Sequence, residues 1–227
     1  MICKAVLFDL IGTTIKEKDN ETINNCFLKA FADNHVTADN ILLKANRGKD
    51  KWEIIKLILH STHQNTSLKK AIYNSFKKNV EDSIENFSPA EDADEIFNFL
   101  SKRSIKIGLG TGLSRDLFEK IVAHVKWDKR LFDYIGLSGE TGKSRPHPAM
   151  ILDLMYTFNI VNPAEVLKVG DTIADIQEGK NANVITAVIL SGTQTKEELM
   201  KENPDFILNN LNEIKNIIDP ISTVDLY

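Results

Sequence analysis

The strongest constraint on this chain is the alternation of short apolar runs with helical patterns that begins after Ser88-Pro89. Between the runs, apolar residues recur at the spacing of amphipathic helices, as in Leu117–Val125 and Met150–Phe158. Strands that alternate with helices pair in parallel, so the pattern predicts a doubly wound parallel α/β sheet. The predicted strands are Ile105–Leu109, Tyr134–Leu137, Val166–Val169, Val184–Leu190 and Phe206–Leu208.

An earlier apolar run, Lys4–Leu10, is expected to join the same sheet, but the segment that follows it has no strand pattern. That segment carries three apolar stripes at helical spacing, within Ile23–Phe31, Ile54–Leu59 and Leu68–Val80. We therefore expect residues 16–87 to form an all-helical cap domain. The α/β core into which this cap is inserted would consist of residues 1–15 and 88–227.

Composition excludes several classes of partner. With 227 residues and a formal net charge of −4, the chain offers no broad basic face for nucleic acid or an anionic membrane. No apolar run approaches the roughly 20 residues of a membrane-spanning helix, and the N-terminal residues do not resemble a secretory signal. The two cysteines, Cys3 and Cys26, are expected to be reduced. We expect a cytoplasmic protein without nucleic-acid or membrane partners; the sequence leaves its oligomeric state open.

Polar side chains follow the ends of the predicted strands. Asp9 lies at the end of the apolar run that begins at Lys4, and Thr111 follows the strand predicted to end at Leu109. Arg145 lies in the loop after the strand that ends at Leu137, and Asp171 follows the one that ends at Val169. The carboxyl ends of parallel strands meet at one edge of the sheet, where ligands bind. Two carboxylates suit Mg²⁺, and a cation together with an arginine suits a phosphoryl group. An aspartate at such a site can also attack phosphorus directly.

Four motifs resemble those of the haloacid dehalogenase superfamily and occur in its order, with the predicted helices between the first and second. They are Leu7-Phe8-Asp9-Leu10-Ile11-Gly12-Thr13-Thr14, Leu109-Gly110-Thr111-Gly112, Arg145-Pro146-His147-Pro148 and Val169-Gly170-Asp171-Thr172-Ile173-Ala174-Asp175. The resemblance covers nearly the whole chain. It implies a hydrolase with a Rossmann-like catalytic core, a helical cap and a Mg²⁺ cofactor.

The resemblance also implies a role for individual residues. Asp9 is then the nucleophile, and it holds Mg²⁺ together with Asp171 and the backbone carbonyl of Ile11. Asp175 supports or joins this metal shell. The residues that would bind the phosphoryl group are Thr111, Gly112 and Arg145.

Four features resemble the phosphonatase (phosphonoacetaldehyde hydrolase) branch more than other family phosphatases. Ile11 stands where most of those phosphatases carry an aspartate as general acid and base, and a hydrocarbon cannot protonate a leaving group. Arg145-Pro146 replaces the commoner Lys-Pro, and Gly170–Ala182 fits the fourth phosphonatase motif closely. Phosphonatase places its imine-forming lysine three residues after a glycine of the cap, and Lys51 has that position relative to Gly48.

Other positions depart from phosphonatase. Ile54 and Asp19 stand where it has a histidine and a cysteine, Arg47 replaces a methionine, and Leu113 replaces an aromatic residue. An arginine that enters the pocket suits a substrate with a second negative charge better than a bare aldehyde. Arg47 and Lys51 are therefore candidate substrate-binding residues.

The leading hypothesis is a Mg²⁺-dependent hydrolase in which Asp9, Thr111, Arg145 and Lys51 act on a small phosphonate or phosphorylated metabolite. One alternative is a small-metabolite phosphatase similar to phosphoglycolate phosphatases, in which a good leaving group or a cap residue replaces the missing acid. The other is a catalytically weak protein that binds a phosphorylated metabolite, which the hydrocarbon at Ile11 would permit.

Overall fold

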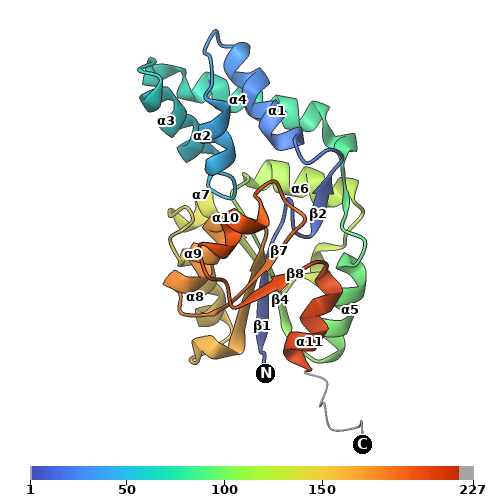
Figure 1. Cartoon of the computed structure of the whole chain (residues 1–227). Coiled ribbons are helices and arrows are strands. Elements are labelled where there is room, and N and C mark those ends of the chain that lie inside the picture. Colours follow the sequence, from blue (N-terminus) through green and yellow to red (C-terminus); the bar gives the residue numbers. More distant parts are fainter. Residues whose placement is uncertain (1, 220–227) are drawn as a thin grey trace, which may run out of the picture.

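The computed structural model describes residues 2–219 as an α/β fold with helices on both faces of a six-stranded sheet (Figure 1). The strands of this sheet are β1 (Ala5–Asp9), β4 (Lys106–Thr111), β5 (Tyr134–Leu137), β6 (Val166–Gly170), β7 (Ile185–Ile189) and β8 (Phe206–Leu208). Their order is β5-β4-β1-β6-β7-β8, and all neighbours pair in parallel. This arrangement confirms the predicted doubly wound parallel sheet. Each strand begins and ends within two residues of its predicted run.

The central strand β1 is buried on both faces, as a strand in a parallel sheet must be. Its residues alternate between two cores: Val6 and Phe8 belong to one hydrophobic cluster, and Ala5 and Leu7 belong to the other. Helices α5, α6 and α11 cover the first face, and α8, α9 and α10 cover the second. The covering helices are α5 (Ala93–Lys102), α6 (Arg115–His124), α8 (Ala149–Thr157), α9 (Ile173–Asn181), α10 (Lys196–Met200) and α11 (Ile214–Ile218).

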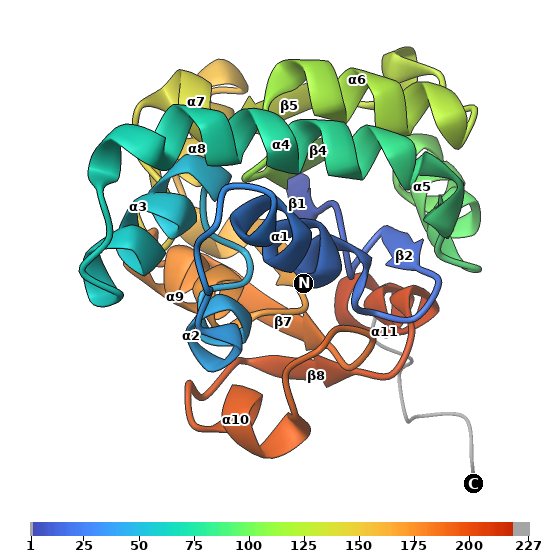
Figure 2. The ribbon, with the colours of Figure 1, turned by 90° about the horizontal axis from the view of Figure 1, so that it is seen from above.

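Four helices that lie between the first and second strands of the sheet form what we call the helical segment (residues 22–82). Its helices are α1 (Thr22–Ala32), α2 (Asn40–Ala45), α3 (Lys51–Ser61) and α4 (Lys69–Asp82). Figures 1 and 2 show this segment above the carboxyl edge of the sheet. The three predicted stripes lie on α1, α3 and α4, where Phe27 stacks on Phe76 at 4.2 Å. The sequence did not indicate α2, because six residues are too few to show a helical period.

A two-stranded antiparallel ribbon joins the helical segment to the sheet-bearing part of the chain. It pairs β2 (Ile15–Glu17) with β3 (Phe87–Pro89). The prediction that no strand occurs between Lys16 and Phe87 was therefore wrong at both ends of that segment. Neither strand of the ribbon is an apolar run, since each includes polar residues, and their pairing depends on residues about 70 positions apart. The ribbon therefore holds side by side the two segments by which the chain enters and leaves the helical segment.

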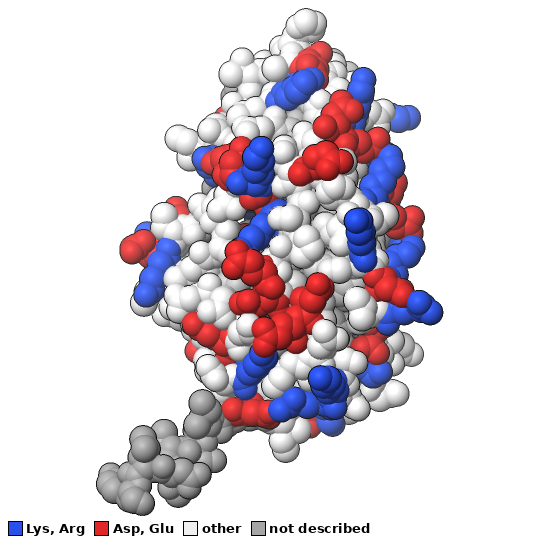
Figure 3. Space-filling model, turned by 90° about the vertical axis from the view of Figure 1, so that its right-hand side faces the viewer, with Lys and Arg blue, Asp and Glu red and all other residues white. Residues whose placement is uncertain are grey.

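The surface carries both signs of charge. On the side of the molecule shown in Figure 3, acidic and basic side chains are interspersed. Among residues 2–219, none of the helices combines the length and the apolar character needed to cross a membrane. A further short helix, α7 (Ser138–Thr141), follows β5 and ends at Gly142, which has a left-handed backbone conformation.

Candidate active site

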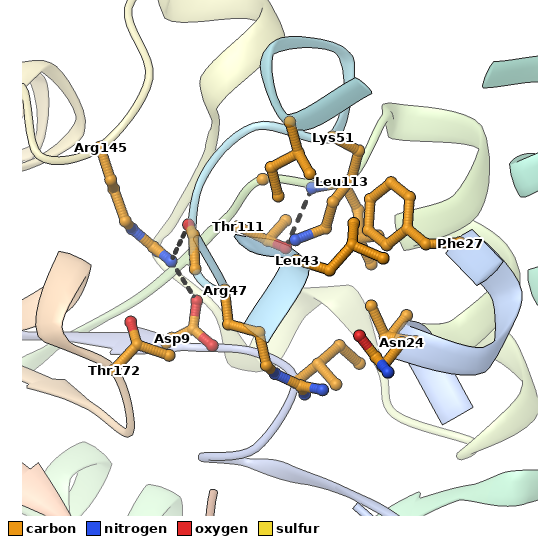
Figure 4. Close-up of a pocket in the computed structure, with 15 residues that line it drawn as sticks. Asp9, Asn24, Phe27, Leu43, Arg47, Lys51, Thr111, Leu113, Arg145 and Thr172 are labelled. Atoms are coloured by element: carbon orange, nitrogen blue, oxygen red, sulfur yellow. Dashed lines mark hydrogen bonds and ion pairs between the residues drawn. The ribbon is translucent and has the colours of Figure 1, made fainter. Parts of the chain in front are cut away.

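The carboxyl ends of three adjacent strands meet beneath the helical segment. Asp9 ends β1, Thr111 ends β4, and Asp171 follows directly on β6. Because β1 pairs with both β4 and β6, these side chains share one edge of the sheet. A cavity of about 30 Å³ opens there (Figure 4). The candidate site residues that line it are Asp9, Ile11, Arg47, Lys51, Thr111, Gly112 and Arg145.

Asp171 and Asp175 lie beside Asp9 and complete a buried acidic triad. One carboxylate oxygen from each lies within 4.8 Å of the others. Oδ1 of Asp171 accepts a hydrogen bond of 2.9 Å from Thr13, and its buried Oδ2 has no hydrogen-bond partner among the described residues. Burial and the charges of the other two carboxylates raise the pKa of Asp171 to about 8.

The donor set of the triad fits a hard divalent cation. Such a cation favours carboxylate oxygens, and it would relieve the repulsion between the three acids. Gly192 allows the close packing around Asp171, because a Cβ there would lie 2.1 Å from the free Oδ2. Oδ2 of Asp171 is therefore free to bind a cation, and the negative charge of the three carboxylates favours one there.

Arg145 is fully buried behind Asp9, and most of its donors are used within the protein. Its Nη1 contacts Asp9 Oδ1 and also donates to the carbonyl of Gly48 at 3.1 Å. Its Nη2 donates to the carbonyl of Gly110 at 2.7 Å, and its Nε donates to Glu178 at 2.9 Å. The sequence led us to expect a phosphoryl ligand here. In this structure the guanidinium lines the cavity and contacts Asp9, and its binding of a phosphoryl group stays a prediction.

Two further charged residues, Lys168 and Glu178, were missed in the sequence. Lys168 lies in the middle of β6 and is 2.8 Å from Asp175 and 3.3 Å from Glu178. Burial opposes ionisation of Asp175, but Arg145 and Lys168 outweigh it and hold its pKa below the ordinary value. A lysine inside an otherwise apolar predicted strand was the available signal, since a buried lysine needs a charged partner.

Lys51 lies at the start of α3 and reaches the cavity from the side opposite Asp9 and Arg145 (Figure 4). Its ammonium donates to the carbonyl of Lys49 at 3.1 Å, and only 9% of the residue is exposed. The pKa of Lys51 is lowered to about 8, chiefly by burial; Asp9 opposes this shift, and the charges of Arg47 and Arg145 contribute to it. A fraction of this amine is therefore uncharged near neutral pH, beside the proposed nucleophile.

Arg47 also lines the cavity, but its charge is matched within the protein. It forms a buried ion pair with Glu17 of β2 and donates to the carbonyl of Asn20 at 3.4 Å. We had expected this arginine to meet a second negative charge of the substrate. Because Glu17 already holds the guanidinium, the pair adds less positive charge to the cavity than the sequence suggested.

Proteins with this arrangement of acidic strand ends beneath a group of helices are known. Residues 6–189 match the sequence model of the haloacid dehalogenase-like hydrolases, and this chain belongs to that family. It is therefore a haloacid dehalogenase-like hydrolase.

The named relatives include phosphonoacetaldehyde hydrolases and a protein with a pyrophosphatase name. The chain is 26% identical to a phosphonoacetaldehyde hydrolase from Lactiplantibacillus plantarum, over 85% of this chain and 78% of the relative. It is 28% identical to a Clostridium perfringens protein that carries the pyrophosphatase name PpaX, over 97% of this chain and 99% of the relative. The crystal structure of a phosphonoacetaldehyde hydrolase-like protein from Oleispira antarctica shares the fold. That comparison gives a TM-score of 0.82 and 17% identity, over 96% of this chain and 92% of the other.

Proposed function

We propose that this protein is a Mg²⁺-dependent hydrolase that removes the phosphoryl group from a small phosphonate with a carbonyl group next to the C–P carbon. One observation carries the proposal: the amine of Lys51 lines the same cavity as Asp9, while position 11, beside the nucleophile, holds an isoleucine. An amine that forms an imine removes the need for an acid at that position. The named phosphonoacetaldehyde hydrolases among the relatives support the same assignment.

Mg²⁺ would be held by Asp9, Asp171 and the backbone carbonyl of Ile11, with Asp175 supporting them. When bound, the ion supplies positive charge to the phosphoryl oxygens and offsets the charge of the carboxylates. Thr111 would orient the phosphoryl group. Its Oγ1 accepts a hydrogen bond of 3.2 Å from the amide of Leu113, which leaves the hydroxyl hydrogen to be donated to a substrate oxygen.

The chain's own residues account for the bond changes. Lys51 Nζ adds to the substrate carbonyl, and loss of water leaves a protonated imine. A carboxylate oxygen of Asp9 then bonds to phosphorus as the C–P bond breaks. The electron pair of that bond moves into the imine and forms a neutral enamine. Protonation on carbon and hydrolysis release the organic product and Lys51, and water hydrolyses the phosphoryl group from Asp9.

Residues 16–87 would act as a cap that opens and closes over this chemistry. The cavity of about 30 Å³ holds only a few water molecules. A substrate therefore enters only if the helical segment moves away from the sheet. Both connections between the helical segment and the sheet run through the β2–β3 ribbon, so the ribbon would act as the hinge of that motion.

A phosphatase acting on a small phosphate ester is the second candidate. With a pKa of about 8, Lys51 is mostly protonated at neutral pH, so its ammonium could donate the proton that the missing acid would supply. The relative with the pyrophosphatase name spans nearly the same length and supports this alternative. The third candidate is a weakly catalytic binder of a phosphorylated metabolite.

The deciding experiment measures phosphate release with and without Mg²⁺ across a panel of small phosphonates and phosphate esters that includes phosphonoacetaldehyde. The proposal predicts Mg²⁺-dependent release from carbonyl phosphonates at a higher kcat/KM than from esters. Release from esters alone would favour the phosphatase. If no compound is turned over, the hydrolase proposal fails and the binding protein remains.

A further inference from the structure

One polar side chain in the cavity has no role in the proposed chemistry, and one of its hydrogen-bonding atoms has no partner among the described residues. Asn24 lies on α1 and is only 3% exposed, and it lines the cavity with Asp9 and Lys51. Its Nδ2 donates to Oδ1 of Asn40 at 2.8 Å. Its Oδ1 is buried and has no hydrogen-bond partner among the described residues. Figure 4 shows this side chain reaching toward the cavity from α1.

The free oxygen of Asn24 contrasts with the surfaces around it. Besides Ile11, five apolar side chains line the cavity together with Asn24. They are Ile23, Phe27, Leu43, Ile54 and Leu113. A buried acceptor without a partner destabilises the folded state, and a native structure retains such a group where something else satisfies it. These apolar side chains offer no hydrogen bonds to a water molecule, which needs two to four polar neighbours to stay bound.

We infer that the organic part of the substrate carries a hydrogen-bond donor, a hydroxyl or amino group, that binds to Oδ1 of Asn24. This inference rests on the proposed function and narrows its substrate class. The phosphoryl group lies at Asp9 and Thr111, the carbonyl carbon lies at Lys51, and the donor lies at Asn24. An unsubstituted short-chain aldehyde phosphonate has no such donor, so it is a weaker substrate than a hydroxylated or aminated one.

Two pairs of compounds that differ by one hydroxyl group test the inference. The phosphonate pair is 2-oxopropylphosphonate and 3-hydroxy-2-oxopropylphosphonate. The ester pair is 1-hydroxypropan-2-one phosphate and dihydroxyacetone phosphate. For each pair we expect the wild-type protein to favour the hydroxylated member at least about 10-fold in kcat/KM, because the partner without the hydroxyl leaves the buried acceptor unpaired. The Asn24→Leu and Asn24→Ala variants should bring that ratio to about one.

The Asn79→Leu variant is the matched control. Asn79 is also a buried amide at the contact between α1 and α4, where it donates to the carbonyl of Cys26 at 3.3 Å, but it does not line the cavity. It should keep the wild-type ratio even if the helical segment becomes less stable. Calorimetric affinities of the Asp9→Asn variant with Mg²⁺ give the same ratio for any pair that is not turned over.

The outcomes separate this inference from the proposed function. If only the esters are cleaved but the hydroxylated member is preferred, the phosphonate assignment fails and the role of Asn24 stands. If phosphonates are cleaved without regard to the hydroxyl group, the function stands and the inference is overturned. A wild-type preference that survives in both Asn24 variants also overturns it, because another group then recognises the donor.

Discussion

At the scale of single residues, the site combines an aspartate nucleophile that lacks a general acid two positions on with a lysine of lowered pKa. Asp9 has Arg145 against one carboxylate oxygen, whereas the residue two positions on is the hydrocarbon Ile11. Lys51 reaches the same cavity from the other side. The chemistry we propose depends on both residues, because the aspartate takes the phosphoryl group and the amine takes the electrons of the broken bond.

Replacing Asp9 by asparagine tests the nucleophile. Asp9→Asn preserves the size of the side chain but removes the attacking oxygen anion and one metal charge, so we expect less than a few per cent of wild-type phosphate release. Circular dichroism should show an unchanged fold. Asp82→Asn, at an exposed position on α4, serves as the control and should keep full activity. Substantial activity in Asp9→Asn would assign the nucleophile to another residue.

The pKa of Lys51 makes a prediction about stability. Its pKa is about 8 in the folded protein and near 10.5 in the unfolded chain, so between these values the unfolded chain binds more protons. The contribution of Lys51 to folding stability should therefore rise with pH across that window. In Lys51→Met this rise should disappear, and the variant should be more stable than the wild type at pH 7.

Urea unfolding at a series of pH values measures this difference. Lys78→Met, at an exposed position of α4, is the control and should keep the wild-type pH dependence. Equal pH dependence in the wild type and in Lys51→Met would contradict the buried state that we describe for this amine.

At the scale of elements, the loop between α2 and α3 holds the helical segment against the sheet. The amide of Asp50 donates to Ser144 Oγ at 2.9 Å, and the amide of Lys51 donates to the carbonyl of Gly112 at 3.3 Å. Gly48 has a positive φ of 85°, and its carbonyl accepts from Arg145. The same arginine nitrogen contacts Asp9, so the position of this loop and that of the nucleophile are linked.

A methyl group at Gly112 should separate these elements. A Cβ there would lie 2.3 Å from the carbonyl oxygen of Lys49, so the loop must shift and carry Lys51 away from Asp9. We expect Gly112→Ala to lower kcat/KM about 10-fold or more, because small displacements of reacting groups are costly. Gly139→Ala, whose Cβ would meet nothing within 4 Å, should have wild-type kinetics. Unchanged kinetics in Gly112→Ala would show that the loop contact does not matter for turnover.

The charged pairs between β6 and α9 make a second prediction at this scale. Glu178→Gln leaves Lys168 and Arg145 with one fewer partner in a fully buried setting. Breaking such a pair costs roughly 3–5 kcal/mol of unfolding free energy. Adding Lys168→Met should recover part of that loss, and urea unfolding of the two single variants and the double variant measures the coupling. Strictly additive effects would contradict a shared network.

The elements also show how far the sequence carried the analysis. The six strands of the sheet were predictable because each is a short, mainly apolar run, and the helices α1, α3 and α4 were predictable because each is long enough to show a helical period. The ribbon of β2 and β3 and the helix α2 were not, since their few residues are placed by distant contacts.

The site divides in the same way as the fold. The strand-end residues Asp9, Thr111 and Asp171 follow from the topology of a parallel sheet. The pairing of Arg47 with Glu17 and the free oxygen of Asn24 depend on how the helical segment packs, which no local pattern encodes.

At the scale of the whole molecule, the proposed reaction needs groups from two parts of the chain. The sheet supplies Asp9 and the rest of the acidic triad, and the helical segment supplies Lys51 and Asn24. Neither part holds both the nucleophile and the amine. Closure of the helical segment would therefore assemble the site and exclude water at the same time.

Trapping an imine tests this account most directly. The protein is incubated with phosphonoacetaldehyde and Mg²⁺, reduced with borohydride, digested and mapped by mass spectrometry. The account predicts a stable adduct on Lys51 that requires the substrate, together with loss of phosphate release in the reduced protein and in Lys51→Arg. The absence of any adduct, with Lys51→Arg releasing phosphate at the wild-type rate, would contradict it and leave a phosphatase without imine chemistry.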